Sequence, residues 1–300
     1  MIEETVLYLL YRLGIFLAKN FPLKFSYKIA CLVADAYYSI SYNDRRAVIK
    51  NINVVLGHTT PDKESRRIAR AVFRNFAKYL VDFFRFSKID EAYIKKFIRV
   101  EGIANLDEAL SKGKGAVLLS AHIGNWELGA SILSLIGYPT AAVVLSHKHK
   151  KINDFFLEQR KMCKVQPIEI GISLKACYKL LKDNKLLALL GDRDFTGNGL
   201  NSEFFGQNTL IPKGPSVFSR RIGSAIVPTF MIREDDDTFK LIFEKPIYPD
   251  LSMEEGFALK TLTRKCTSII ESYIRKYPAQ WYAFKYIWDK DELLRPDTII

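Results

Sequence analysis

The amino-acid sequence predicts an α/β protein: a mixed, mostly parallel sheet flanked by helices, with a helical N-terminal region. Two observations predict this fold class. From Gly113 onward, short apolar runs alternate with longer segments whose apolar residues recur at helical spacing. Such alternation is typical of parallel or mixed sheets with helices on both faces. A chain of 300 residues, of which 48% are hydrophobic, is long enough to bury the core of such a fold.

The first expected element is an amphipathic helix between Val6 and Phe21. Arg12 and Lys19 interrupt this stretch, which is too short and too charged to predict a membrane span. A helix of this kind either lies in the membrane interface or packs on the protein's own core. The apolar residues that recur at helical spacing are Val6, Leu9, Leu10, Leu13, Phe16 and Leu17.

A second apolar helix is expected from Tyr27 to Tyr42. The chain is therefore expected to divide into N-terminal helices in residues 1–42 and an α/β domain in residues 43–300. A third helix is expected from Pro61 to Phe86, because proline suits the first turn of a helix and acidic residues follow it. Residues 97–101 predict a short strand.

Beyond Gly113 the predicted strands and helices alternate along the chain. Asp235–Asp237 predicts a hairpin turn between the last two strands. The predicted strands are 116–120, 140–145, 165–168, 186–190, 225–231 and 239–243. The predicted helices are 126–136, 151–161, 173–184, 214–222 and 254–276.

The net charge of +12 indicates an anionic partner: nucleic acid, an acidic protein or an anionic membrane surface. The basic residues are spread along the chain, and no zinc-finger, RNA-recognition or helix-turn-helix signature accompanies them. We therefore expect no nucleic-acid partner, and favour a membrane and an acidic protein.

The four cysteines form no CxxC pair, which fits inert thiols in a reducing compartment. His147 and His149 form a His-Lys-His step in a basic stretch. A metal would need further ligands at suitable spacing, and no HExxH motif is present. We expect no metal and no bound cofactor.

The most informative stretch of the sequence lies around His122. His122 follows the apolar run that ends at Ser120, and Asn125 is placed to cap the next helix. His122 is therefore expected at the carboxyl end of a strand, with Glu127 in the first helical turn, where open α/β folds gather their chemistry. An imidazole with a carboxylate can act as a general base, and no neighbouring Ser or Cys offers a nucleophile. The acceptor is then expected to be a substrate hydroxyl.

A histidine and an acid separated by four residues resemble the motif of membrane glycerolipid and glycolipid acyltransferases, although the acid here is Glu127 rather than Asp. With the flanking Gly-Asn-Trp-Glu, the stretch most resembles the lipid A biosynthesis acyltransferase family, the lauroyl and myristoyl transferases. Phosphatidylinositol mannoside acyltransferases share the pattern. Further blocks follow in the family's order: Arg45–Ile52 with Val54–Gly57 and Phe73–Leu80, Gly191–Phe195, Ile211–Pro215, and Tyr277–Trp281 with Trp288.

Three charged residues, Asp192, Arg193 and Asp194, follow the buried strand that ends at Leu190. If the strands are parallel, these charges share a sheet edge with His122. They could bind the head group of the acceptor or tune the pKa of His122. The alternative is an ordinary strand-end turn with salt-bridged charges.

Arg160, by its place after the histidine motif, resembles a family arginine that faces the thioester carbonyl, where a fixed guanidinium can stabilise an oxyanion. The alternative is a solvated helix arginine. Lys213 and Gly214 open a further helix, whose free amides can meet an anion such as a phosphate. The alternative there is a tight turn that needs Gly and Pro for conformation only.

The resemblance implies transfer of an acyl chain from acyl carrier protein or acyl-CoA to a hydroxyl of a glycolipid such as a lipid A precursor, at the cytoplasmic face of the inner membrane. Because the family usually carries an N-terminal membrane anchor, it also implies that residues 1–42 are membrane-associating helices and that residues 43–300 form the acyltransferase domain. His122 would deprotonate the hydroxyl and Glu127 would hold the imidazole. The acceptor could also be a glycosylated phosphoinositide or another glycolipid. Two rivals are a non-catalytic membrane-binding relative and a lipid hydrolase, but the sequence has no G-x-S-x-G elbow.

Overall fold

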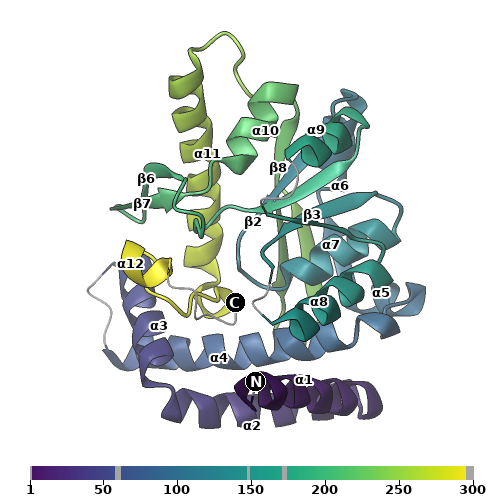
Figure 1. Cartoon of the computed structure of the whole chain (residues 1–300), viewed down its shortest axis with the longest axis vertical. Helices are drawn as coiled ribbons and strands as arrows, with labels where there is room; N and C mark the ends of the chain where they lie inside the picture. Colours follow the sequence, from purple (N-terminus) through teal and green to yellow (C-terminus); the bar gives the residue numbers. More distant parts are fainter. Residues whose placement is uncertain (1, 58–61, 147–148, 171–173, 295–300) are drawn as a thin grey trace.

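The computed structural model describes residues 2–57, 62–146, 149–170 and 174–294, and the side chains from residue 8 onward (Figure 1). Its centre is a seven-stranded sheet in the order β1-β9-β8-β2-β5-β3-β4. Every neighbouring pair is parallel except β8–β9, so the predicted mixed, mostly parallel sheet is confirmed. The strands are β1 Ile98–Glu101, β2 Ala116–Ser120, β3 Thr140–Val144, β4 Gln166–Glu169, β5 Leu186–Leu190, β8 Ala225–Arg233 and β9 Phe239–Phe243.

Each face of the sheet builds its own core, because alternate residues of a strand point to opposite faces. Leu118 of β2 packs with apolar residues of α6, α7 and α8, whereas Val117 and Leu119 pack with α9, α10 and α11. The helices therefore cover both faces, as predicted. Their bounds are α6 Ile103–Ser111, α7 Trp126–Leu135, α8 Lys150–Met162, α9 Leu174–Lys182, α10 Gly214–Ile222 and α11 Glu255–Lys276.

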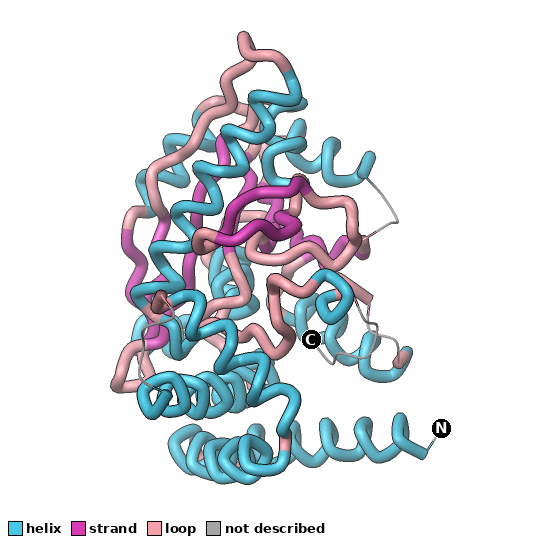
Figure 2. Tube along the Cα trace, turned by 90° about the vertical axis from the view of Figure 1, so that its left-hand side faces the viewer, coloured by secondary structure: helices cyan, strands magenta, loops and turns pink. Residues whose placement is uncertain are grey.

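The N-terminal region is a layer of four helices: α1 Ile2–Asn20, α2 Leu23–Ile40, α3 Tyr42–Val55 and α4 Asp62–Phe84. Helix α4 lies between α1 and α2 on one side and the α/β body on the other (Figures 1 and 2). A third core cluster joins α2, α3 and α4 to the C-terminal segment through residues such as Ala34, Ile52, Phe73 and Tyr282. The N-terminal helices thus pack directly on the part of the chain that carries the site.

Sequence patterns predicted the bounds of most elements to within two or three residues. The bounds of β2, β5, β9 and α10 agree fully with the prediction. The patterns predicted no element at α5 (Glu91–Phe97), at α6 or at the antiparallel hairpin of β6 (Leu200–Phe204) and β7 (Gln207–Ile211). The hairpin is held by long-range contacts, since Phe204 packs on Trp281 and Trp288. Pro61, Ser173 and His147, which also carried expectations, lie outside the described residues, as does the side chain of Val6.

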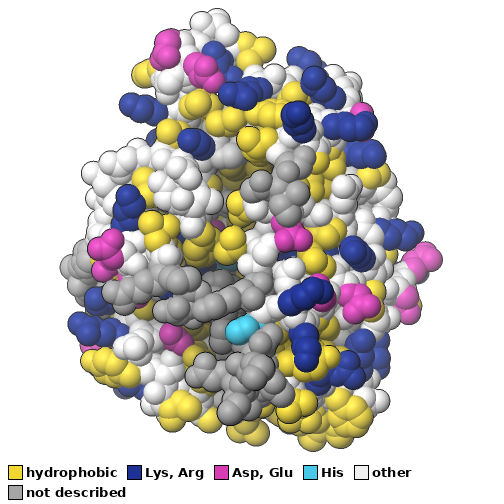
Figure 3. Space-filling view, viewed as in Figure 1, with side chains coloured by type: hydrophobic (Ala, Val, Ile, Leu, Met, Phe, Trp, Pro, Cys, Tyr) yellow, Lys and Arg dark blue, Asp and Glu magenta, His cyan; other side chains and the backbone are white. Residues whose placement is uncertain are grey.

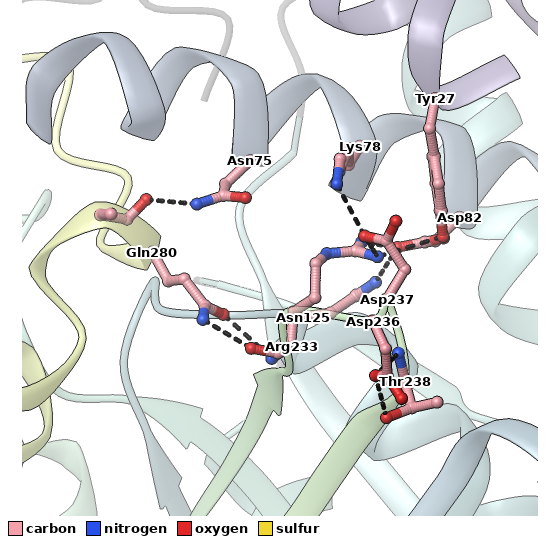
Figure 4. A network of polar contacts seen from close by, with 11 residues as sticks. Tyr27, Asn75, Lys78, Asp82, Asn125, Arg233, Asp236, Asp237, Thr238 and Gln280 are labelled. Atoms are coloured by element: carbon pink, nitrogen blue, oxygen red, sulfur yellow. Dashed lines mark hydrogen bonds and ion pairs between the residues drawn. The ribbon is translucent and has the colours of Figure 1, made fainter. Parts of the chain in front are cut away.

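A buried polar network joins α2, α4, α7 and β8 around Asp82, which is 4% exposed (Figure 4). Asp82 accepts hydrogen bonds from Tyr27 of α2 and Arg233 of β8. It also accepts one from the side-chain Nδ2 of Asn125, at 3.0 Å. Burial raises the pKa of the Asp82 carboxyl, and its hydrogen-bond donors oppose that shift. Asp237 extends the network by accepting from Lys78 Nζ at 2.7 Å. The network therefore ties the N-terminal helices to the start of α7.

We expect Asp82→Ala to lower the free energy of unfolding by about 3 kcal/mol or more, because it leaves the buried Arg233 without its main counter-charge. Asp62→Ala is a matched control on the same helix, since Asp62 pairs with Arg66 at the surface. The control should leave stability nearly unchanged. Urea unfolding of the two variants measures the difference, and equal losses would contradict the assignment of Asp82 as a structural centre.

Candidate active site

His122 lies in a tightly held junction between β2 and α7. Its carbonyl accepts a hydrogen bond from Tyr282 N at 2.8 Å, and Gly124 N donates to Gln280 O at 2.9 Å. Gly124 has a φ of +63°, and a Cβ there would lie 1.9 Å from the carbonyl oxygen of Met231. Only glycine fits this position, because both the backbone conformation and the space exclude a side chain. The junction is thereby fixed against β8 and the C-terminal segment.

Asn125 ends the junction and caps α7, as the sequence predicted. Its side-chain oxygen accepts from Leu128 N at 3.1 Å. The backbone N of Asn125 donates to Met231 O at 2.8 Å. Glu127 consequently lies in the first turn of α7.

The carboxylate that contacts His122 belongs to Asp192. His122 Nδ1 lies 2.8 Å from Asp192 Oδ1, and the backbone N of His122 donates to the same oxygen at 3.2 Å. The other carboxylate oxygen accepts from Trp281 Nε1 at 3.0 Å and from Arg193 Nε at 3.2 Å. Asp192 is fully buried. An acceptor at Nδ1 selects the tautomer that carries its proton there, which leaves Nε2 as the basic nitrogen.

The charges around this pair set its protonation. Burial lowers the pKa of His122, and the neighbouring Arg193 lowers it further, while Asp192 opposes both. For Asp192, burial would raise the pKa, but the combined effect of Arg193, His122 and Trp281 outweighs it and the pKa falls. A neutral imidazole therefore faces an ionised carboxylate near pH 7, which is the state that a general base requires.

The expectation that Glu127 holds the imidazole is wrong. Glu127 instead accepts from Arg160, with Nη2 at 2.6 Å from Oε1 and Nε at 3.0 Å from Oε2. Both side chains are less than 10% exposed, so Arg160 is not the solvated helix arginine that we had considered. Glu127 is sequentially close to His122, but the junction turns its side chain toward α8.

The register of the sheet explains why Asp192 is the partner. Ser120 of β2 is paired with Leu190 of the parallel strand β5. His122 and Asp192 each follow these paired residues by two positions, so the two side chains emerge side by side. Once two parallel strands are known to be neighbours, residues that follow their paired ends by the same number of positions can be predicted from the sequence to lie close together.

A cavity of about 570 Å³ opens beside His122, Glu127 and Arg160. It runs between α7 and the sheet, where Leu118, Ala188 and Ala142 form a row in register across β2, β5 and β3. The remaining lining is mostly aliphatic and aromatic, and includes Tyr11 of α1, Phe76, Tyr79 and Leu80 of α4, and Leu133 of α7. The arrangement is an apolar channel with a base and an ion pair on its wall.

The other predicted site residues lie outside the lining of this cavity. Arg193 is buried and donates to Tyr282 O at 2.8 Å as well as to Asp192. Asp194 turns back onto its own loop, where it accepts from Thr196 Oγ1 at 2.8 Å and Gly199 N at 2.9 Å. The alternative of a strand-end turn with paired charges therefore describes this segment well.

Lys213 and Gly214 open α10, as predicted, and Lys213 is exposed. The structure does not bring them together with His122. Sequence reasoning assigned no role in the site to Trp281, which it placed only in the C-terminal family block. Trp281 is 1% exposed, and its indole N–H helps to hold Asp192.

The description "bacterial lipid A biosynthesis acyltransferase" names a family whose model matches residues 2–290. The chain belongs to this family. The resemblance inferred from the sequence motifs is thus confirmed.

Relatives in the lipid A biosynthesis acyltransferase family differ in the acceptor that their names state. The phosphatidylinositol mannoside acyltransferase of Mycolicibacterium smegmatis is 27% identical over 86% of this chain and 84% of its own length. The lipid A biosynthesis palmitoleoyltransferase of Escherichia coli is 24% identical over 80% of this chain and 75% of its own. The solved 1-acyl-sn-glycerophosphate acyltransferase of Thermotoga maritima aligns over 87% of this chain and 99% of that chain, with 14% identity and a TM-score of 0.38.

We expect the pKa of His122 to lie below that of an exposed histidine, and to fall further in Asp192→Asn. The substitution removes the charge that favours the imidazolium and leaves Arg193 in place. Glu127→Gln is the matched control, because Glu127 has the smaller effect of the two carboxylates on His122. NMR titration of the imidazole in folded protein measures each value. A higher pKa in Asp192→Asn would contradict this electrostatic assignment.

Proposed function

We propose that this acyltransferase moves a fatty acyl chain from a thioester donor to a hydroxyl of a membrane glycolipid. The observation that carries the proposal is that His122 is oriented by a buried carboxylate and lies on the wall of an apolar cavity. The cavity volume lies in the range of ordinary ligand pockets, roughly 300–1,000 Å³. A fatty acyl chain supplies the apolar surface that such a cavity would bury.

In the proposed reaction, His122 Nε2 takes the proton of the acceptor hydroxyl while the hydroxyl oxygen attacks the thioester carbonyl. The tetrahedral intermediate then collapses, the ester forms and the carbon–sulfur bond breaks. The imidazolium returns its proton to the leaving thiolate. Asp192 orients the ring and stabilises the transient imidazolium, as a carboxylate does in other histidine-based sites.

Arg160 is proposed to stabilise the oxyanion of that intermediate. Its guanidinium is 8% exposed, lines the cavity and is held by Glu127 in a two-pronged ion pair. A donor that is fixed before the reaction stabilises developing charge without reorganising. Glu127 is then the residue that positions Arg160. Arg193 and Asp194 are proposed to act by holding Asp192 and its loop, not by touching a head group.

We propose that the protein contacts the membrane through α1 and α2. Residues 1–42 would then be the membrane-associating part of the chain, and residues 43–300 the acyltransferase domain. Leu9, Leu10, Leu13 and Phe16 of α1 are each more than 50% exposed, while Tyr11 of the same helix lines the cavity. Apolar side chains gather at the lower edge of the molecule in Figure 3, where α1 and α2 lie. Within the described residues, no helix is long and apolar enough to cross a bilayer. We infer that α1 lies in the interface, at the cytoplasmic face of the inner membrane.

The acceptor is proposed to be a glycolipid, with a lipid A precursor and a phosphatidylinositol mannoside as the two candidates that the relatives' names suggest. The donor is proposed to be acyl carrier protein or acyl-CoA. The net charge of +12 favours an acidic carrier through electrostatic steering. A non-catalytic relative would have no need for a buried His–Asp pair, so we favour the enzyme.

We expect His122→Ala to lower acyl transfer by at least about a hundredfold, the usual minimum for loss of a general base. Asp192→Ala should also lose most of the activity, and the double variant should be little worse, because the two residues act as a unit. His149→Ala, at the start of α8 and outside the cavity lining, is the control. Transfer of a labelled acyl chain to extracted glycolipid measures the rates, and more than a tenth of wild-type activity in His122→Ala would overturn the mechanism.

We expect Ala188→Leu to shift the preferred donor toward shorter acyl chains, because the larger side chain fills part of the channel. Each methylene that loses its place forfeits about 0.8 kcal/mol, or roughly fourfold in relative rate. Ala188→Ser changes the volume little and should keep the wild-type preference. Competition between acyl donors of different length gives the profile, and an unchanged profile in Ala188→Leu would place the acyl chain elsewhere.

A further inference from the structure

A stripe of cations runs along one face of α4, away from the active site. Its members recur at helical spacing, and Arg45 of α3 and Tyr38 of α2 face them across a groove of about 800 Å³. Within the described chain, the groove shares no lining residue with the cavity beside His122. The cations of the groove, which we call the α4 groove, are Arg45, Lys63, Arg66, Arg67, Arg70 and Arg74.

The α4 groove keeps an excess of positive charge after its internal ion pairs are made. Asp35 of α2 binds both Arg70 and Arg74, at 2.8 and 2.5 Å. Asp62 and Glu64, one turn away on α4, bind Arg66 and Arg67 at 2.7 and 2.6 Å. Six cations therefore face three acids, and the four α4 arginines remain 45–75% exposed. Their guanidinium groups have donors left for an anion from solution.

An apolar surface adjoins the α4 groove on α2. Leu32, Val33 and Ile40 are 70%, 63% and 80% exposed. Asp35, the residue that joins α2 to Arg70 and Arg74, follows Leu32 by three positions, so these two side chains are neighbours on the helix surface. Val33 and Ile40 extend the apolar surface further around α2. The groove and the apolar surface therefore adjoin at Leu32, and an extended surface that covers one would meet the other.

We propose that the α4 groove binds the phosphate of an anionic phospholipid while the exposed face of α2 enters the bilayer. Arginine presents forked donors that match phosphate oxygens, and one groove can hold a head group with several of them. A bilayer offers apolar tails and anionic phosphates side by side, whereas an acidic protein would leave the apolar face of α2 unexplained. The inference rests on the proposed membrane association but not on acyl transfer.

The test compares sedimentation with vesicles of phosphatidylcholine alone and of phosphatidylcholine mixed with phosphatidylglycerol. The triple variant Lys63→Gln/Arg66→Gln/Arg67→Gln should bind the mixed vesicles at least about tenfold more weakly, as expected for removing three cations from an anionic surface. Binding to phosphatidylcholine alone should not change, because the apolar residues remain. The matched control is Lys175→Gln/Lys179→Gln/Lys182→Gln, which removes the same charge from the exposed face of α9.

Each of the following results would overturn the proposal. Equal losses in the two triple variants would mean that only net charge matters, and unchanged binding in the α4 variant would place the groove away from the membrane. Loss of binding to an acidic carrier protein with vesicle binding intact would assign the groove to that partner. As a check on geometry, Arg66→Lys/Arg67→Lys keeps the charge and should bind more weakly than wild type; equal binding would exclude a built phosphate site.

Acyl transfer in neutral detergent micelles separates this proposal from the proposed function. The α4 variants should keep wild-type rates there, because the groove lies outside the catalytic cavity. A wild-type protein that bound anionic vesicles through the groove but transferred no acyl chain would overturn the proposed function alone. Loss of micellar activity in the α4 variants, with the control unaffected, would overturn the assignment of the groove to membrane binding.

Discussion

The contact between His122 Nδ1 and Asp192 Oδ1 depends on a carboxylate that is buried completely. An isolated charge in that position would be strongly unfavourable, and the fold compensates by surrounding it with donors. Besides His122, these are the indole of Trp281 and the guanidinium of Arg193. Because Trp281 belongs to the C-terminal segment and Arg193 follows β5, the site can form only when the ends of the α/β body have come together.

The junction that carries His122 is held from several sides. Met231 of β8 and Gln280 and Tyr282 of the C-terminal segment bind its backbone. Asp82 of α4 holds Asn125, and Tyr27 brings α2 into the same network (Figure 4). A buried network in which the polar groups are hydrogen-bonded holds its residues in one arrangement. The proposed base requires this, because proton transfer depends on a fixed position relative to the substrate.

The N-terminal helices connect the proposed chemistry to the proposed membrane surface. Helix α1 contributes Tyr11 to the apolar cavity and exposes Leu9, Leu13 and Phe16 on its other side. Helix α2 places Tyr27 in the core and its opposite face in solvent. The cavity beside His122 is thus bounded by the helix that carries the proposed membrane surface, and the α4 groove would fix the orientation of the protein on the bilayer.

Much of this protein was determined by local sequence. The periodicity within β2, β5 and β9 and the cap at Asn125 are properties of a few adjacent residues, so these strands, the start of α7 and the position of His122 could be predicted from them. The same local pattern correctly predicted that His122 follows the carboxyl end of β2.

Only the tertiary structure decided which charges meet. Glu127 is five positions from His122 but binds Arg160 on α8, whereas Asp192, seventy positions away, reaches the imidazole because β5 is the parallel neighbour of β2. The hairpin β6–β7 is similarly held by Phe204 against distant tryptophans. Helical and strand periods are encoded by side chains a few residues apart, but the pairing of buried charges depends on strand order, which no short stretch of sequence contains.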